Sequence, residues 1–293
     1  MNARLPAGKG NDGRTLAGAR KWCSGCNCKS RRSENVDSDA PFMPFAFFDL
    51  DQTLLPYDTQ TLFCNFVLRR HGWRRAYMGI FAAAVPLRAL RIIGTSGLKS
   101  AFLSYLWRMP RARLTELAHE FAEKIVPGLL YSELLAEVER HRAAGRTLIL
   151  TTASPEFYAT AIARVLKFDH CFGTRILFQS DRLPLIPRID GENNKHEEKL
   201  KRMRHLLPVE LSLPLPGSWA YSDSRADLPM LRYVEYPVVV HPDPALERVA
   251  VEEQWPILRP ARPHASRMQF FCDCAWQAAG FWTSPQPFAR GAE

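Results

Sequence analysis

An apolar run that ends in two carboxylates constrains the fold of this chain more than any other feature. The run reads Phe45-Ala-Phe-Phe, and Asp49-Leu-Asp51-Gln-Thr53 follows it directly. Because the run is short and rich in aromatic residues, it predicts a buried strand rather than a helix. Open α/β sheets bind ligands at the carboxyl edge of their strands, where these acids would lie. By itself, however, the stretch is equally compatible with a strand followed by a polar turn.

The rest of the chain predicts an α/β protein with a helical insertion. Helical periodicity extends over residues 57–128, and Arg146–Thr151 has the composition of a second buried strand. Helix and strand patterns alternate from there onward, as in a parallel sheet with crossover helices. We therefore expect an α/β core over residues 43–56 and 129–258, a helical cap over 57–128 and an irregular tail over 259–293.

Residues 1–42 have the composition of a disordered tail and contain no apolar stretch of the kind that a secretory signal needs. Met43 stands directly before the first predicted strand, so a start at Met43 is an alternative. Cys23, Cys26 and Cys28 cluster in this tail, but a zinc site takes about four ligands, and the role of the three stays open. The seven cysteines do not indicate a disulfide framework, which makes a cytoplasmic location the simpler expectation.

Segment 74–94 combines an apolar stretch of nearly membrane length with arginines. Arg88 and Arg91 interrupt the stretch, and Pro86 lies within it. We favour a buried helix of the cap, and a helix lying on an anionic membrane surface is a compatible alternative. The formal charge of +9 favours anionic partners in general. The chain has no signature of nucleic-acid binding, so a nucleic-acid partner is not expected.

Two later stretches carry groups that suit a phosphate. The second predicted strand ends at Thr152-Ala-Ser154-Pro, where serine at the N-cap and proline at the first helical position indicate a helix start. Such a junction presents backbone N–H groups that can hold a phosphate. Further along, Lys199 lies early in a basic helix, from which a lysine can reach a phosphoryl oxygen. A solvated helix face is the simpler explanation for its neighbour Lys195.

A third later stretch adds two more acids. Another apolar segment ends at Asp223, and Asp227 follows four residues later. Together with Asp49 and Asp51, these residues would place four carboxylates at neighbouring strand ends, where unpaired negative charges repel one another. A bound Mg²⁺, which prefers an octahedral shell of oxygen ligands, would relieve the repulsion. The sequence therefore predicts a magnesium site at this edge of the sheet.

The order of these motifs resembles the haloacid dehalogenase superfamily of phosphotransferases, over about residues 43 to 258. The position of the helical insertion is similar to that in its phosphoserine-phosphatase-like branch, subfamily IB. The resemblance implies a Rossmann-like core, in which helices flank a central parallel sheet, with an inserted all-helical cap. The matched positions are Asp49, Asp51 and Thr53 for D-x-D-x-T, Thr152 for the strand-end hydroxyl, Lys199 for the lysine, and Asp223 and Asp227 for D-x-x-x-D.

The resemblance also implies a Mg²⁺-dependent phosphatase that works through an aspartyl-phosphate. Asp49 would be the nucleophile and Asp51 the general acid and base. Mg²⁺ would be held by Asp49, the backbone carbonyl of Asp51 and Asp223, with Asp227 in support. The expected catalytic residues that bind phosphoryl oxygens are Thr152 and Lys199. The full expected substrate-binding set is Thr53, Asp58, Thr152, Ser154 and Lys199.

The substrate stays open because the chain departs from the family pattern. Gln52 replaces a common glycine, a change from which we expect little effect, and Asp58 stands where phosphoserine phosphatases have a glutamate that holds the substrate amine. The Phe-Phe-Asp-Leu-Asp and Tyr-Ser-Asp-Ser stretches and the basic cap are similar to bacterial phosphatidylglycerophosphatase C. A phosphorylated small molecule such as phosphoserine, and a lipid phosphate at the inner face of the membrane, are therefore alternative substrates. Transfer to an acceptor other than water, and a binding protein that retains the fold, are further alternatives.

Overall fold

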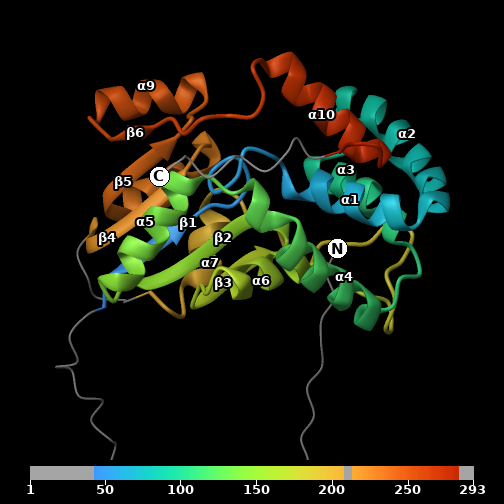
Figure 1. Cartoon of the computed structure of the whole chain (residues 1–293), viewed down its shortest axis with the longest axis horizontal. Coiled ribbons are helices and arrows are strands. Elements are labelled where there is room, and N and C mark those ends of the chain that lie inside the picture. Colours follow the sequence, from blue (N-terminus) through green and yellow to red (C-terminus); the bar gives the residue numbers. More distant parts are fainter. Residues whose placement is uncertain (1–42, 208–212, 284–293) are drawn as a thin grey trace, which may run out of the picture. The chain divides into compact units, whose positions relative to one another are not determined.

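One six-stranded parallel sheet organises the computed structural model, which describes residues 43–207 and 213–283. The strand order is β3-β2-β1-β4-β5-β6, so the first strand of the chain lies inside the sheet (Figure 1). This is the open α/β architecture that the sequence predicts. The strands are β1 (Phe45–Phe48), β2 (Thr147–Pro155), β3 (His170–Thr174), β4 (Leu215–Ser222), β5 (Val234–Val240) and β6 (Ile257–Leu258).

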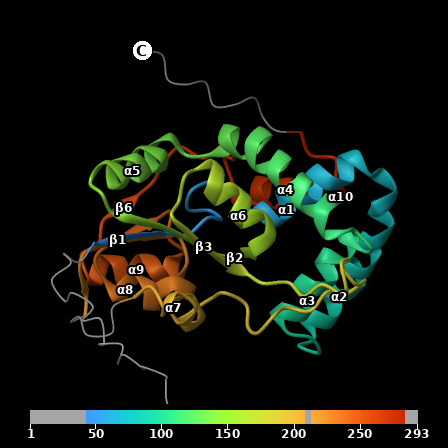
Figure 2. The same ribbon diagram turned by 90° about the horizontal axis from the view of Figure 1, so that it is seen from below.

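β1 is buried on both faces because its side chains alternate between two apolar layers. Phe45 and Phe47 belong to one layer, whereas Ala46 and Phe48 belong to the other. Phe48 stacks on Tyr221 of β4, with ring centroids 4.4 Å apart. The helices that cover the two faces are α5 (Ser132–Ala143) and α6 (Glu156–Val165) on one side, and α7 (Glu197–Met203), α8 (Leu228–Tyr233) and α9 (Pro244–Glu252) on the other (Figure 2).

β1 has β2 on one side and β4 on the other, and these are the strands that carry the sequence motifs. Phe48 is in register with Leu150 of β2 and with Tyr221 of β4, and all three strands run parallel. Their carboxyl ends therefore lie side by side. The fold thereby brings residues that are distant in the chain to one edge, since the Thr53 and Asp223 side chains meet there.

A helical region lies between β1 and α5. It consists of α1 (Thr59–Arg70), α2 (Met78–Ala89), α3 (Thr95–Phe102) and α4 (Arg111–Lys124), joined by the short 3₁₀ helices η1 (Gly72–Tyr77), η2 (Leu103–Leu106) and η3 (Val126–Leu129). None of the helices in residues 43–207 and 213–283 has the length and hydrophobicity that a membrane span requires.

The favoured prediction of a buried helix within segment 74–94 is wrong. Ala84 is the single buried residue of α2, although nearly the whole helix is apolar. Phe81 holds α2 against α3 through an edge contact with Phe102, with ring centroids 4.9 Å apart. Hydrophobic composition shows that a helix can be buried, whereas the neighbouring elements decide whether it is.

The prediction of an irregular tail over residues 259–293 is also wrong for part of that range. Arg267–Ala279 form helix α10, which begins at the N-cap Ser266 and ends at Gly280 with φ 74°. Gln277 is buried and accepts a hydrogen bond from Thr61 of α1. The serine and glycine caps are sequence signals that could have revealed this helix. Residues 1–42, with Cys23, Cys26 and Cys28, and residues 284–293 lie outside the described residues.

The close packing of α10 on α1 predicts a cost for any side chain at position 280. A Cβ atom at Gly280 would lie 2.5 Å from Leu68 Cβ, and the positive φ disfavours other residues. We expect Gly280→Ala to lower the free energy of unfolding by about 1–3 kcal/mol. Gly79→Ala is the matched control, because a Cβ there meets no atom within 4 Å. Equal stability of the two variants in chemical denaturation would contradict the packing described here.

Candidate active site

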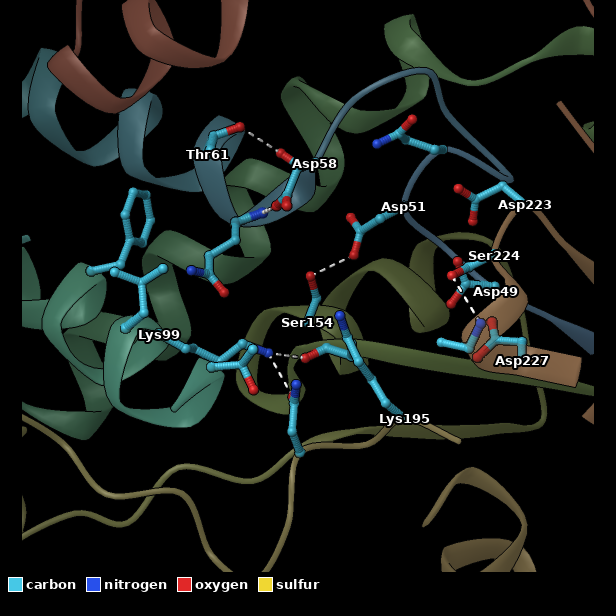
Figure 3. Close-up of a pocket in the computed structure, with 18 of the residues that line it drawn as sticks. Asp49, Asp51, Asp58, Thr61, Lys99, Ser154, Lys195, Asp223, Ser224 and Asp227 are labelled. Carbon is cyan, nitrogen blue, oxygen red and sulfur yellow. Dashed lines mark hydrogen bonds between the residues drawn. The ribbon is translucent and has the colours of Figure 1, made fainter. Parts of the chain in front are cut away.

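A cavity of about 460 Å³ lies at the carboxyl edge of the sheet, between the core and the helical region. The core contributes acids and a lysine from the ends of β1 and β4 and from α7, and α1, α2 and α3 contribute the opposite wall (Figure 3). The predicted site residues that line it are Asp49, Asp51, Asp58, Ser154, Lys199, Asp223 and Asp227.

Lys199 is held between two carboxylates in the interior. Its ammonium donates to Asp49 Oδ1 at 2.7 Å and to Asp227 Oδ2 at 2.6 Å, and the residue is only 1% exposed. Burial alone would lower the pKa of Lys199, but the contacts with Asp227 and Asp49 raise it above its ordinary value. Lys199 is therefore a fixed positive charge at the floor of the cavity.

The pKa of Asp49 is subject to opposing effects. Burial raises its pKa to about 7 against the opposing attraction of Lys199, and the nearby Asp227 and Asp51 add to the rise. Its Oδ1 is occupied by Lys199, whereas Oδ2 faces the Thr53 hydroxyl at the long distance of 3.4 Å. Asp49 thus keeps one oxygen that the protein engages only weakly.

Asp223 and Asp49 approach the same hydroxyl from two strands. Thr53 Oγ1 lies 3.4 Å from Asp223 Oδ1, and burial together with the charge of Asp49 raises the pKa of Asp223 well above its ordinary value. Within the described residues, no three acidic, histidine or cysteine side chains are close enough to form a complete metal site. The two carboxylates nevertheless form an oxygen-only donor pair, which fits Mg²⁺.

Asp51 is held by three donors, two from β2 and one from the start of α1. Its carboxylate accepts hydrogen bonds from Ser154 Oγ at 2.6 Å, from Thr152 Oγ1 at 3.2 Å and from the Thr59 backbone N–H at 2.7 Å. Thr152 and Thr53 are completely buried and do not line the cavity. In this arrangement the Thr152 hydroxyl donates a hydrogen bond to Asp51 and does not face the cavity.

Asp58 has a structural task besides the predicted contact with substrate. It is the N-cap of α1, where its Oδ1 accepts the Gln60 N–H at 2.8 Å. Burial, helped by the charge of Asp51, raises its pKa to about 6. Since Asp58 also lines the cavity, it presents a negative or protonatable group to any ligand there.

Sequence reasoning missed Lys99, which reaches the site from α3. Its ammonium donates to Asn193 Oδ1 at 2.7 Å and to the Ala153 carbonyl, so it connects the helical region to the core. Burial lowers its pKa to about 8, although the charge of Asp58 partly offsets this. Lys195, which we assigned to a solvated face, also lines the cavity. Neither lysine belongs to a local motif that could have identified it.

The backbone at Gln52 explains why glycine is common at that position. Gln52 has φ 59°, in the left-handed region that costs residues other than glycine about 1 kcal/mol. Gln52 also lines the cavity. The expectation that this change has little effect on the chemistry stays a prediction.

Comparison with known proteins places the chain in a hydrolase family. Residues 46–232 match the haloacid dehalogenase-like hydrolase family. The chain is 29% identical to a histidinol-phosphatase of Neisseria meningitidis over 224 residues, which are 73% of this chain and 97% of the relative. It is 28% identical to phosphoserine phosphatase SerB1 of Mycobacterium tuberculosis over 216 residues, 72% of this chain and 69% of the relative. Two further relatives from Mycobacterium tuberculosis, one of them a probable phosphatase, are 32% identical over 159 residues, so the chain spans 53% of their length.

A solved structure has a similar fold. A Bordetella pertussis protein of unknown function superposes with a TM-score of 0.62 and 27% sequence identity. The alignment covers 74% of this chain and 98% of that protein. The Rossmann-like core and the helical additions are therefore shared with this protein.

The raised pKa of the half-buried Asp58 predicts a pH-dependent stability difference. Its folded pKa of about 6 lies above the unfolded value, so the folded state binds this proton more tightly and loses stability as pH rises from 4 to 6. Asp58→Asn keeps the cap without the charge. We expect it to raise the free energy of unfolding by about 1–2 kcal/mol at pH 7–8 and by nothing below pH 4.

Denaturant unfolding at several pH values measures this difference. Asp243→Asn is the control, because Asp243 caps α9 in the same way but does not line the cavity. A gain of stability that is equal at all pH values would show that charge burial at Asp58 is not its cause.

Proposed function

Since the chain belongs to the haloacid dehalogenase-like hydrolase family, we propose that it is a Mg²⁺-dependent phosphatase that hydrolyses a phosphomonoester through an aspartyl-phosphate on Asp49. The observation that carries the proposal is the position of Asp49. It lies at the floor of the cavity beside the fixed charge of Lys199, with one oxygen only weakly engaged. A nucleophile next to a buried cation suits attack on an anionic phosphoryl group.

Asp49 and Asp51 have environments that suit different tasks. Asp49 Oδ2 would attack phosphorus as the bond to the leaving oxygen breaks, while Asp51 gives its proton to that oxygen. Water would then attack the aspartyl-phosphate, with Asp51 taking the proton and Asp49 leaving as a carboxylate. The donors from Ser154 and Thr59 hold Asp51 in one orientation throughout.

The proposed metal ligands are Asp49, Asp223 and the backbone carbonyl of Asp51. When bound, Mg²⁺ supplies positive charge that favours an ionised Asp49 and offsets the charge of the phosphoryl oxygens. Asp227 would support the site indirectly, because its Oδ2 accepts from both Lys199 and Ser222 at 2.6 Å.

The leaving group of the substrate would lie against the cavity wall that the helical region forms. This wall combines Asp58 and Lys99 with the apolar Phe81, Leu98 and Phe102. Two relatives are named for different monoesters, phosphoserine and histidinol phosphate. The similarity therefore supports a phosphomonoester as the class of substrate but does not select one compound. The three apolar side chains favour a lipid phosphate as the second candidate. Hydrolysis of phosphatidylglycerophosphate no faster than of soluble monoesters would exclude that candidate.

The free thiols of Cys64, Cys171, Cys272 and Cys274 support a cytoplasmic location within this proposal.

Replacement of the nucleophile tests the proposed mechanism. We expect Asp49→Asn to lower kcat by about a thousandfold or more across a panel of phosphomonoesters, since an amide cannot form the intermediate. Exposed Asp181 lies outside the cavity, so Asp181→Asn is the matched control and should retain activity. Borohydride reduction of the quenched wild-type enzyme should convert residue 49 to homoserine, detectable by mass spectrometry. Undiminished turnover in Asp49→Asn would refute the assignment.

Metal removal tests the proposed ligands. Chelation with EDTA should abolish turnover and added Mg²⁺ should restore it, because the acids at the sheet edge then lose and regain their counter-ion. We expect Asp223→Asn to raise the Mg²⁺ concentration for half-maximal activity by about tenfold or more. A variant with an unchanged Mg²⁺ requirement would remove Asp223 from the proposed ligand set.

A further inference from the structure

The helix α2 and the turn after it expose an apolar surface. Val85 and Leu87 are 44% and 40% exposed, and Leu90 and Ile92 are 70% and 66% exposed. Large apolar side chains scattered singly on a surface are ordinary, but a contiguous group is a candidate interaction site. All four exposed side chains lie within residues 85–92.

A second apolar group lies on α10. Met268, Phe271 and Trp276 are 73%, 64% and 57% exposed, and Cys272 between them is also exposed. Positions 268, 271, 272, 275 and 276 follow the spacing of one helix face. Gln277 on the other side of the helix is buried against α1. The apolar face of α10 is thus directed away from the protein.

The two groups lie at the same end of the described residues. Arg75, just before α2, donates to the Ala279 carbonyl at the end of α10 and to the Gly280 carbonyl, both at 3.0 Å. Its guanidinium also lies 4.3 Å from the ring centroid of Phe281. Figures 1 and 2 place α2 and α10 beside α1 at one end of the sheet. The α2–α10 surface is defined here as Val85, Leu87, Leu90, Ile92, Met268, Phe271, Trp276 and Phe281.

The charges around the α2 part of this surface are of one sign. Residues 59–115 contain ten lysines and arginines and no aspartate or glutamate. Arg88 and Arg91 lie within the α2 part, and their guanidinium groups form no ion pair with any residue of the described ranges. An apolar surface bordered by unpaired cations is complementary to a partner that is both apolar and anionic.

We propose that the α2–α10 surface binds the face of an anionic lipid bilayer, with apolar side chains entering the lipid and arginines contacting headgroups. A bilayer is both apolar and anionic. Its acyl chains cover apolar side chains, and its anionic headgroups attract basic residues near the surface. A second copy of the chain fits less well. A symmetric contact would set Arg88 and Arg91 of one copy near those of the other, with no acid between residues 59 and 115 to separate them.

The binding is peripheral, because no helix within the described ranges has the properties of a membrane span. It is also independent of the phosphatase proposal, since none of the eight residues of the surface lines the cavity. Vesicle binding can therefore be measured without substrate, and a failure of one proposal leaves the other standing.

Flotation of the full chain with vesicles tests the proposal. We expect binding to phosphatidylcholine vesicles that contain phosphatidylglycerol, no binding to phosphatidylcholine alone, and weaker binding at high salt. Leu90→Glu and Phe271→Glu should each lower the partition coefficient about tenfold or more, because a carboxylate enters the apolar surface. Arg88→Gln and Arg91→Gln should each lower it about fivefold.

Val251→Glu is the matched control. Val251 is 65% exposed on α9, outside the α2–α10 surface, so this variant should bind vesicles as the wild type does. Thermal melting confirms that each variant is folded. Absent binding of the wild type, equal binding to neutral vesicles, or variants that bind normally would each overturn the proposal. A wild-type dimer that Phe271→Glu dissociates, without vesicle binding, would assign the surface to a second copy instead.

Discussion

A lysine ammonium buried between two carboxylates is the interaction on which the candidate site depends. Lys199 is held in the interior by Asp49 at the end of β1 and by Asp227 of the 3₁₀ helix η4 (Arg225–Asp227), so its two ion pairs join separate elements of the core. Asp227 also accepts from Ser222 at the end of β4. Removing one partner would leave an uncompensated charge in a dry environment, which is strongly destabilising. The cluster therefore fixes the position of the Asp49 carboxylate and the core geometry together.

Acids outnumber lysines around the cavity. Asp223 and Asp49 approach the same hydroxyl, and burial raises the pKa of both. Folding alone does not favour an excess of carboxylates at one sheet edge, and such conflicts concentrate at functional sites. The proposed Mg²⁺ site would account for the conflict, since a divalent cation would supply positive charge to these carboxylates.

The helical region serves the site and also presents a surface of its own. Asp58 and Lys99 face the cavity, and Lys99 ties α3 to the core through Ala153 and Asn193. By contrast, α2 and α10 expose apolar side chains to solvent, which is unusual for helices close to a polar cavity. α2 belongs to the helical insertion, whereas α10 follows the core in the chain and packs on α1.

The sequence by itself determined the α/β class and the order of the acids, the hydroxyl and the lysine, because strand periodicity and strand-end chemistry are local properties. The same local signals predict that Asp49, Asp51, Lys199, Asp223 and Asp227 meet at one sheet edge, and all five line the cavity. The sequence did not determine that α2 is exposed, that α10 is a helix, or that Lys99 reaches the site. Those features depend on contacts between residues that are distant in the chain. Only the tertiary structure decided them, because burial and charge pairing are set by which elements become neighbours.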